Sequence, residues 1–400
     1  MKPSLVSLAV LALGCYAQDR STEEAEAQIT DPNQECSPYY YAPVSLHTSS
    51  FPTIWQPASI LPNDSAAQAL WQSIQPNIPN IQPKPSPQII TSTSGSTNNT
   101  TPTPSNFTYD PTDPDCWWSY HQCTTPKLAG LSPDIVNVPE PLTMGFGFDD
   151  GPNCSHNAFY DFLASKNQKA TMYYIGSNVM DWPLEAQRGL ADGHEICVHT
   201  WSHRYMTSFS SPDAFAELYY TIKLAVGVTP TCWRPPFGDV DDRIRAIAKG
   251  LGLQTIIWDY DSNDWRYGIG GTTKAQVDSN YETFINMATS GQFSSHGGIM
   301  LTHELNNFTM SEMVEFYPQL ESAFKYMVPV GVAYNKTQPY VEKNYTLPTF
   351  EQYISGLTTS NSSAASSGSG SDKKAGAATV ALPMSQIAKI LVVSTALFLL

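Results

Sequence analysis

Hydrophobic and polar residues alternate in a regular way along the middle of this 400-residue chain, from Cys116 to Tyr334. Short apolar runs of strand length are separated by stretches in which apolar residues recur three and four positions apart, as on one face of a helix. We expect strands at 142–148, 170–175, 195–198, 231–234, 254–258, 299–302 and 328–333. We expect helices at 158–165, 183–190, 212–224, 241–249, 274–288 and 311–326. Strands that alternate with helices predict an α/β fold, a distorted (β/α) barrel of about seven strands.

Polar side chains stand at or just after the ends of five of these predicted strands. They are Asp149-Asp150, His199, Arg234, the segment 259–264 and His303. In a (β/α) barrel the catalytic residues come from the carboxyl ends of the strands, which all open on one face. We therefore expect these side chains to meet in one site.

The pair His199 and His203 predicts a metal site. If this segment forms a helix, the two imidazoles lie on one face, because they are four residues apart. A carboxylate from Asp149-Asp150 would complete a set of two histidines and one carboxylate with open positions for water and substrate. A histidine pair alone is more often chance or core packing, and the two carboxylates favour the metal. The spacing lacks the glutamate of a His-Glu-x-x-His motif, which disfavours a metalloprotease.

The beginning of the chain has the composition of a secreted protein. Residues 1–17, with Lys2 and then an apolar run, predict a signal peptide. Residues 18–115 predict an N-terminal arm and a linker, because 77–114 is rich in Pro, Ser, Thr and Asn and poor in large apolar residues. Residues 116–345 are then expected to form the domain that carries the activity.

The end of the chain predicts a membrane anchor. Residues 346–378 are expected to be a Ser/Gly-rich linker with a GPI attachment region, and residues 379–400 a hydrophobic GPI signal tail. The apolar run in this tail is interrupted by Lys389 and is shorter than the roughly 20 residues of a membrane span. A short tail anchor stays open as the alternative.

Cysteines and sequons agree with an oxidising, glycosylating compartment. Six cysteines remain when Cys15 leaves with the signal peptide, and this even number predicts up to three disulfides. Cys116 and Cys123 are near enough to be partners, while the other pairings stay open. No C-x-x-C spacing occurs, so a cysteine zinc site is disfavoured. Nine Asn-x-Ser/Thr sequons predict N-glycosylation.

The charge of the chain limits its partners. The formal net charge is −15, which argues against nucleic acid, whose phosphates require a basic surface. A neutral or cationic partner is favoured instead. We expect the protein to be a monomer.

Five segments of the sequence, in order, resemble the motifs of the NodB-type polysaccharide deacetylases, carbohydrate esterase family 4. They are Phe148-Asp149-Asp150, His199-x-x-x-His203, Arg234-Pro235-Pro236-Phe237, Asp261-Ser262-Asn263-Asp264-Trp265 and Leu301-Thr302-His303. The resemblance covers roughly residues 141–334. With the expected signal peptide and GPI tail, the chain is similar to the fungal chitin deacetylases of that family.

The resemblance implies a metal centre and a general base. Asp150, His199 and His203 are the implied metal ligands, and Zn²⁺ is the expected ion, with Co²⁺ or another divalent transition metal as alternatives. Asp149 is the implied general base for an attacking water. Arg234 resembles the arginine that pairs with this base and keeps it charged.

The resemblance also implies a general acid and a substrate pocket. His303 would protonate the departing nitrogen, oriented by Asp264 in preference to Asp261. The backbone N–H of Phe237 would face the developing oxyanion. Trp265 and Leu301 would form walls of a small pocket for the acetyl methyl group, although core packing is the alternative for both. We expect the remaining histidines of the domain, His121, His156, His194 and His296, to be structural or surface residues.

These expectations describe a metal-dependent hydrolase that removes N-acetyl groups from chitin and gives chitosan and acetate. The implied enzyme is secreted and held by a GPI anchor on the outer leaflet of the plasma membrane and in the cell wall. One alternative is a deacetylase of xylan, peptidoglycan or short glucosamine oligomers. Another is an inactive wall glycoprotein that binds chitin, which the intact set of motif residues disfavours.

Overall fold

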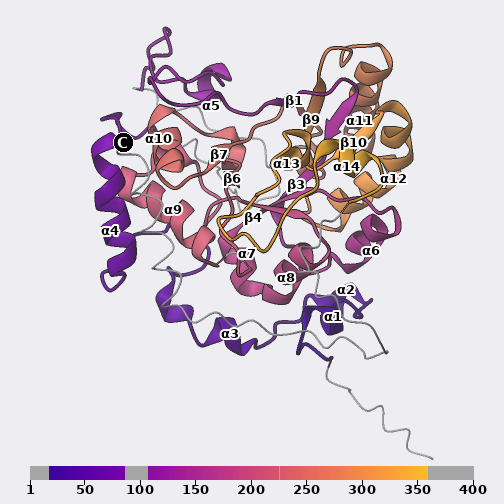
Figure 1. Cartoon of the computed structure of the whole chain (residues 1–400), viewed down its shortest axis with the longest axis horizontal. Helices are drawn as coiled ribbons and strands as arrows, with labels where there is room; N and C mark the ends of the chain where they lie inside the picture. Colours follow the sequence, from indigo (N-terminus) through magenta and orange to yellow (C-terminus); the bar gives the residue numbers. More distant parts are fainter. Residues whose placement is uncertain (1–17, 86–106, 225, 359–400) are drawn as a thin grey trace, which may run out of the picture.

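The computed structural model of this chain describes residues 18–85, 107–224 and 226–358, and in these residues two five-stranded sheets lie at the centre, surrounded by helices (Figure 1). The first sheet consists of β3 (Gly147–Gly151), β4 (Thr171–Tyr174), β5 (Glu195–Val198), β6 (Cys232–Trp233) and β7 (Gln254–Thr255). These strands pair in chain order, and every pair is parallel. Their carboxyl ends therefore share one edge of the sheet.

The second sheet is built around one central strand. Its members are β1 (Asn137–Val138), β2 (Thr143–Gly145), β8 (Tyr260–Asp261), β9 (Gly297–Leu301) and β10 (Tyr326–Val328). Strand β9 pairs with β1, β2 and β8, and β2 pairs on its other side with β10. Among these pairs β1 with β9 is antiparallel, and the others are parallel.

Two isolated bridges join the sheets to each other. Asp149 of β3 pairs with His303, which follows β9, and Ile135, which precedes β1, pairs with Ile256, which follows β7. The described strands still do not form one continuous closed barrel. The predicted α/β class and its distorted barrel arrangement are confirmed, and the bridge at Asp149 brings the ends of β3 and β9 together.

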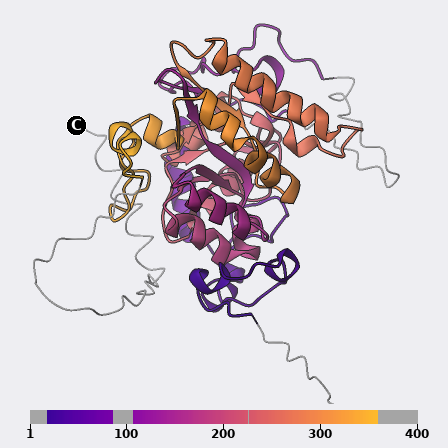
Figure 2. The same cartoon turned by 90° about the vertical axis from the view of Figure 1, so that its right-hand side faces the viewer.

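The helices that cover the sheets match most of the predicted ones. They are α6 (Asn157–Ser165), α7 (Gly176–Asp181), α8 (Pro183–Ala191), α9 (Ser211–Leu224), α10 (Asp242–Gly250), α11 (Lys274–Thr289), α12 (Asn307–Ala323), α13 (Val330–Ala333) and α14 (Phe350–Ile354). Shorter turns of helix are α5 (Trp118–His121), η3 (Met206–Ser208), η4 (Pro236–Gly238) and η5 (Asp264–Arg266). Helices α11 and α12, orange in Figure 2, pack against each other on the outside of the strands.

Side-chain caps fix where the longer helices begin. Thr273 and Gln276 form a capping box at α11, and Asn306 and Thr309 form one at α12. Asp241 accepts a hydrogen bond from the N–H of Ile244 and begins α10. Each cap satisfies N–H groups that the first turn of a helix leaves without partners.

The last predicted strand and helix were shifted from the observed ones. Helix α12 ends at Ala323, three residues before the predicted end at 326, and β10 occupies Tyr326–Val328, two residues before the predicted start of the strand at 328. Residues 330–333, predicted as strand, form the short helix α13 instead. One reason is local, since Pro329 interrupts the strand, and the other is a tertiary contact, in which the N–H of Gly331 donates to the buried carboxylate of Glu195 at 2.8 Å.

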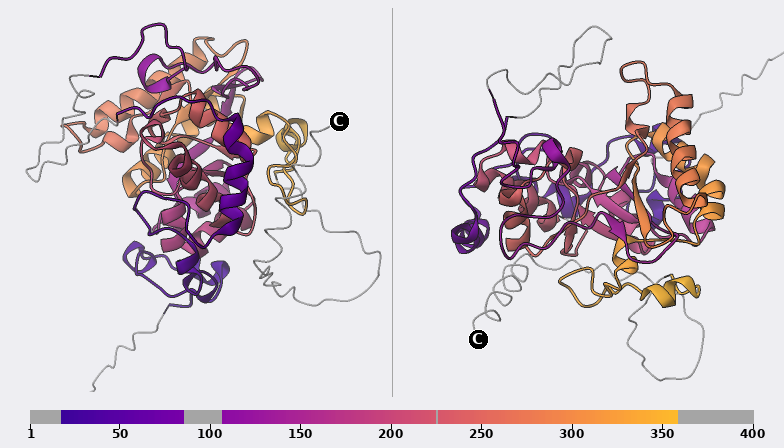
Figure 3. Two further views of the ribbon diagram at one scale, coloured as in Figure 1. Left: turned by 90° about the vertical axis from the view of Figure 1, so that its left-hand side faces the viewer. Right: turned by 90° about the horizontal axis from the view of Figure 1, so that it is seen from above.

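The N-terminal arm wraps around the domain, indigo in Figure 3. It contains α1 (Glu23–Glu26), α2 (Pro32–Glu35), α3 (Ala42–Ser45), η1 (Thr48–Ser50), α4 (Ser65–Ile74) and η2 (Gln75–Asn77). Helix α1 packs against α8, and α4 packs against α9. Both ends of the predicted linker are packed as well, since Lys84 is buried in an ion pair with Asp115 and Tyr109 is buried.

Three disulfides tie these parts together. The pairs are Cys36–Cys154, Cys116–Cys123 and Cys197–Cys232, so the predicted partnership of Cys116 with Cys123 is confirmed. Cys36–Cys154 attaches the arm to the loop that follows β3. The predicted signal peptide and most of the predicted anchor region lie outside the described residues. Within the described ranges, no helix combines the length and the apolar character that a membrane span needs.

Candidate metal centre and active site

Asp150, His199 and His203 converge at the carboxyl ends of β3 and β5. The Nε2 atom of His199 lies 3.3 Å from Oδ1 of Asp150, and the Nε2 atom of His203 lies 3.1 Å from the same oxygen. Asp150 and His199 are buried, and His203 is partly exposed. The structure thus brings together the three side chains that the sequence singled out as metal ligands.

The backbone between the two histidines is not the helix that their spacing suggested. Thr200 and His203 both have positive φ, 66° and 52°, so the chain turns sharply instead of continuing as a helix. Buried Glu217 of α9 supports this turn by accepting hydrogen bonds from the N–H groups of Trp201 and Ser202 at 3.1 and 2.9 Å. The two imidazoles face one carboxylate because of this turn and not because of helical periodicity.

The three side chains have the properties of a cation site. Oδ1 of Asp150 is buried and forms no hydrogen bond, although two imidazole nitrogens lie within 3.3 Å of it. The other ring nitrogen of His199, Nδ1, lies 2.8 Å from the carbonyl oxygen of Arg234, which favours a proton on Nδ1 and a lone pair on Nε2. A buried carboxylate oxygen beside two such nitrogens fits a divalent transition metal.

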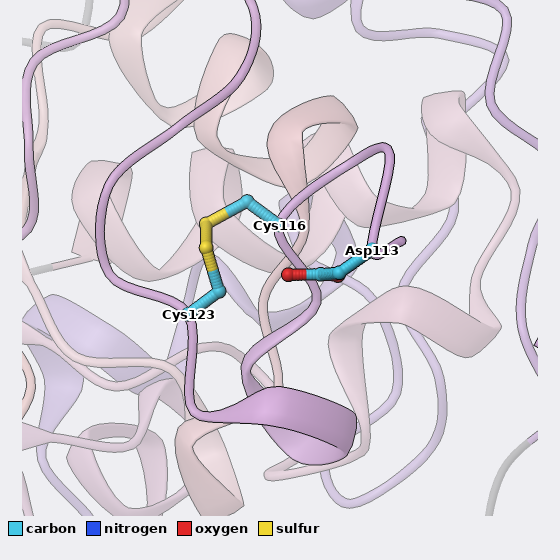
Figure 4. Close-up of side chains that lie close together, drawn as sticks. All are labelled: Asp113, Cys116 and Cys123. Atoms are coloured by element: carbon cyan, nitrogen blue, oxygen red, sulfur yellow. A yellow bond between two sulfur atoms is a disulfide. The ribbon is translucent and has the colours of Figure 1, made fainter. Parts of the chain in front are cut away.

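Two other clusters in the described residues resemble metal sites by distance alone. They are Asp113 with Cys116 and Cys123, and Glu195 with Cys197 and Cys232. In each cluster the two sulfurs form a disulfide, as Figure 4 shows for Cys116 and Cys123. A disulfide offers no thiolate, so neither cluster holds a metal in this state.

Asp149, the neighbour of Asp150 on β3, lies in different surroundings. Nη1 of Arg234 donates to its Oδ1 at 2.6 Å in a buried ion pair. Its second oxygen, Oδ2, lies 3.6 Å from Nε2 of His199 and therefore beside the candidate metal centre. Arg234 also donates to the hydroxyl of Tyr173 and to the carbonyl of Ile257, both at 3.2 Å, which fixes the guanidinium. A carboxylate bound in this way has a fixed direction.

His303 and Asp264 form a second buried pair. Asp264 accepts from the main-chain N–H of His303 at 3.0 Å, and its other oxygen lies 2.5 Å from Nδ1 of the ring. Asp261 has a different partner, the N–H of Asn263 at 2.7 Å. Asn263 has a positive φ of 53°, and this turn directs Asp264 and not Asp261 toward His303. The preference for Asp264 over Asp261 therefore agrees with the geometry.

The charge balance around His303 favours its protonated form. Burial alone would lower the pKa of the ring, but the carboxylates of Asp264, Asp150 and Asp149 outweigh burial and raise the pKa to about 10. For Asp150, burial opposes ionisation, yet the rings of His203, His199 and His303 hold the pKa of the carboxyl well below its usual range. These neighbouring charges favour the protonated form of His303 and the ionised form of Asp150.

The three predicted substrate residues lie near these groups. Phe237 has a positive φ of 58°, and its ring contacts the ring of His203 with centroids 4.8 Å apart. Leu301 is the last residue of β9 and is buried, whereas Trp265 in η5 is 36% exposed. Trp265 is thus available to a substrate, and Leu301 also fits the core alternative.

The sequence did not indicate several residues that contact the site residues or lie next to them in the chain. Tyr173 carries the guanidinium of Arg234 over its ring at 3.9 Å, and Asn178 donates to the carbonyl of Asp150 at 2.7 Å. Glu304 accepts from Tyr160 and from the N–H of Asn153, and burial raises the pKa of Glu304 to about 8. Tyr173 lies within β4 and Asn178 lies in α7, which follows that strand, so the rule that selects polar residues at strand ends identified neither. The position of Glu304 directly after His303 was the available signal.

The remaining histidines are not part of the constellation. His194 precedes β5 and accepts from the N–H of Ala170 at 3.1 Å, and His156 stacks on Tyr160 with centroids 3.8 Å apart. Burial lowers the pKa of both rings, to about 3 for His194. Both are therefore neutral packing residues, as expected from the sequence.

Comparisons with known proteins identify the family of this chain. Residues 138–256 match the family described as polysaccharide deacetylase. Chitin deacetylase 2 of Cryptococcus neoformans var. grubii is 53% identical over 351 residues, which cover 86% of this chain and 74% of that protein. A chitin deacetylase of Amylomyces rouxii is 46% identical over 318 residues, which cover 78% of this chain and 73% of that protein.

A search of solved structures finds the chitin deacetylase of Colletotrichum lindemuthianum, with 22% identity and a TM-score of 0.46 over 51% of this chain and 92% of that one. The two chitin deacetylases are matched over about three quarters of their length. This chain belongs to the polysaccharide deacetylase family.

Proposed function

We propose that this enzyme removes N-acetyl groups from chitin, the polymer of β-1,4-linked N-acetylglucosamine, and gives chitosan and acetate. The observation that carries the proposal is the 53% identity, over 86% of this chain, with a protein named chitin deacetylase 2. The convergence of Asp149, Asp150, His199, His203 and His303 supports an active enzyme, because a binding protein needs no base, acid and ligand set together.

Asp150, His199 and His203 would hold a divalent transition metal. Two nitrogens and one carboxylate oxygen suit Zn²⁺ best, and Co²⁺ is the leading alternative. A bound cation of this kind polarises a carbonyl oxygen and brings the pKa of water down toward about 7. The hydrogen bond between Nδ1 of His199 and the carbonyl of Arg234 would keep the other nitrogen of that ring directed at the ion.

Asp149 would act as the general base. Its Oδ1 is bound to Arg234, so its Oδ2 is the oxygen that faces the candidate metal centre. A water between Asp149 and the acetyl carbonyl would lose its proton to Oδ2 as its oxygen bonds to the acetyl carbon. Arg234 would keep Asp149 ionised before the reaction and hold it in place during proton transfer.

His303 would act as the general acid. Nδ1 is directed to Asp264, so Nε2 is the nitrogen that can deliver a proton to the substrate. When the bond between the acetyl carbon and the sugar nitrogen breaks, this proton converts the departing group into a neutral amine. The backbone N–H of Phe237 would face the developing oxyanion, and Trp265 and Leu301 would enclose the acetyl methyl group.

The composition of the two ends of the sequence supports a position at the cell surface. We propose a signal peptide at 1–17, an arm and linker at 18–115, a catalytic domain at 116–345, a linker at 346–378 and a GPI signal tail at 379–400. A GPI anchor would hold the enzyme, as a monomer, on the outer leaflet where a wall polymer is accessible. The net charge of −15 suits a partner that becomes cationic as acetyl groups are removed.

Acetate release tests the proposal. The purified enzyme is given chitin oligomers, acetylated xylan and peptidoglycan fragments, and acetate is measured for each at equal concentration of acetyl groups. We expect release from chitin oligomers to exceed that from the other two. Faster release from xylan or peptidoglycan would show that this polymer, and not chitin, is the preferred substrate. No release from any of the three would indicate a binding protein.

A further inference from the structure

Residues 51–58 of the N-terminal arm lie on the loop that carries the metal ligands. The ring of Phe51 stacks on Trp201, with centroids 6.0 Å apart and planes 4° from parallel. The indole N–H of Trp201 donates to the carbonyl of Thr53 at 3.1 Å. Trp201 stands between His199 and His203 in the sequence, so the arm is supported by the residue that separates the two histidine ligands.

One buried carboxylate holds the arm and this loop together. Oε1 of Glu217 accepts from the N–H of Ala58 in the arm at 2.7 Å, and Oε2 accepts from the N–H groups of Trp201 and Ser202 in the loop. Glu217 and Ala58 are both fully buried. The arm therefore has a fixed position relative to the candidate metal centre, and this position does not depend on surface contacts alone.

Trp55 is the residue of this segment that stays open to solvent. Its N–H donates to the hydroxyl of Ser177 at 2.8 Å, and its indole N–H donates to Asp181 at 3.0 Å, so the side chain is anchored along α7. Its carbonyl accepts from Arg204, the residue after His203, at 3.4 Å. Two contacts of Trp55 are next to residues of the candidate metal centre. Ser177 is adjacent to Asn178, which donates to the carbonyl of Asp150, and Arg204 directly follows the candidate ligand His203.

The conformation of Trp55 is costly for a residue that only covers the surface. Its φ is 61°, in the left-handed region that bulky side chains rarely adopt, and the residue is 39% exposed. The indole N–H bond to Asp181 and the backbone bonds to Ser177 and Arg204 together hold the residue in this conformation. Backbone strain of this kind is concentrated where a side chain has to be presented to a ligand.

We propose that Trp55 binds the substrate polymer, with its indole face against the apolar face of a sugar ring some distance from the acetyl group that is removed. An indole that is fixed by its N–H and belongs to a residue 39% exposed offers a rigid amphipathic surface that loses little entropy on binding. This inference rests on the proposed function for the identity of the polymer.

The order of the strands shows on which side of β3 the Trp55 contact lies. β5, which leads to His199 and His203, lies beyond β4 on one side of β3, whereas His303 pairs with β3 on the other side. Trp55 joins the β5 side through Arg204 and α7. A sugar on Trp55 would therefore lie on the opposite side of the site from the general acid, and we expect a longer chain of sugars to be needed to contact both.

Equilibrium binding in an Asp149→Asn background, which suppresses turnover, tests this contact. Dissociation constants for hexamers and dimers of N-acetylglucosamine are measured by calorimetry. The proteins compared are the Asp149→Asn parent and the same parent with Trp55→Ala, Trp55→Phe or Tyr40→Ala. Tyr40 is the matched control, since it is an aromatic residue of the same arm and 68% exposed. Thermal melting of each protein shows that the arm remains folded.

We expect Trp55→Ala to weaken hexamer binding roughly tenfold and Trp55→Phe less, with a smaller effect of each on the dimer. Tyr40→Ala should bind as the parent does. A change below twofold for Trp55→Ala, or equal losses for hexamer and dimer, would overturn the role of Trp55. Failure of the parent to bind the hexamer would overturn it too.

Acetate release by the enzyme with Asp149 intact is measured in parallel. If the enzyme releases acetate from chitin oligomers but Trp55→Ala binds the hexamer as the parent does, the proposed function stands and only the role of Trp55 is wrong. If the enzyme releases no acetate but Trp55→Ala weakens hexamer binding tenfold, the role of Trp55 stands and the proposed function is wrong.

Discussion

The two halves of the site differ in how complete they are. On the β5 side, Asp150, His199 and His203 bring one oxygen and two nitrogens within 3.3 Å, yet the shared oxygen forms no hydrogen bond. On the β9 side, Asp264 bonds both the ring and the main-chain N–H of His303. In the first half, a cation would be the partner of the Asp150 oxygen. In the second half, the hydrogen bonds from Asp264 alone orient His303.

This difference explains why two adjacent aspartates have different roles. Asp149 forms an ion pair with Arg234, while Oδ1 of Asp150 lies beside the imidazoles of His199 and His203. The pleat of β3 directs neighbouring side chains to different surroundings, and Asp150 also has a positive φ of 70°. A change on the metal side should therefore remove the ion, and a change on the other side should leave it bound.

The largest effect is expected from His199→Ala. This change removes one of three ligands and the ring that bonds the carbonyl of Arg234, so bound metal and acetate release should both fall to background. Elemental analysis of the purified variant and an acetate assay check this. His194→Ala is the control, since His194 is buried away from the site and should keep its metal. A His199→Ala protein with full metal content would contradict the ligand assignment.

Asp149→Asn should separate chemistry from metal binding. The amide keeps the shape of the carboxylate but cannot take a proton, so turnover should fall about 10³- to 10⁴-fold while metal content stays at the parent level. Initial rates with chitin oligomers and elemental analysis on the same sample check both parts. Loss of metal together with activity would show that Asp149 is itself a ligand.

A smaller effect is expected on the acid side, and it should depend on the leaving group. His303→Ala should slow amide hydrolysis about 10²-fold, because the departing nitrogen then lacks its proton. An activated aryl ester, which leaves without a proton, should be slowed much less. The ratio of the two losses is the measurement. Equal losses on amide and ester would contradict the role of His303 as an acid.

The sequence predicted the parts of the site that follow from strand ends. Asp150, His199, Arg234 and His303 were identified because each follows an apolar run, and parallel strands end at one edge. The convergence of the two histidines was expected for a wrong local reason, a helix, where positive φ at Thr200 and His203 provides it. Such turns depend on tertiary partners, here Glu217, and local pattern does not contain them.

Other features depend on contacts between distant segments. The position of Trp55 requires Ser177 and Asp181, more than 120 residues away in the chain. The pairing of Cys36 with Cys154 spans 118 residues, and sequence spacing selected only the short-range pair Cys116–Cys123. The pattern of apolar residues identifies which segments are buried but not which of two distant segments meet.

The smallest expected effect concerns the arm that supports the metal side. Burial raises the pKa of Glu35 to about 7 and that of Glu185 to about 8, although Arg20 and Arg188 nearby favour the charged forms. A carboxyl with a raised pKa stabilises the docked arm below its unfolded pKa, near 4.5, and this contribution is lost as pH rises through 7 to 8. The arm should therefore dock more firmly at pH 5 than at pH 9.

Hydrogen exchange at these two pH values, corrected for the intrinsic rate, tests this. We expect protection of residues 18–50 to decrease at pH 9 and protection of the segment around Asp264 to stay constant. Glu185→Gln, which is neutral at both values, should reduce the change. Equal protection of the arm at both pH values would show that these carboxyls do not control docking.

The central claim is that the metal side is incomplete without a cation and the acid side is not. Metal content and acetate release of the purified enzyme, measured before chelation, after it and after return of Zn²⁺, test this claim most directly. We predict about one ion per chain, loss of acetate release when the ion is removed and recovery when it is returned. Undiminished acetate release from metal-free protein would contradict the account.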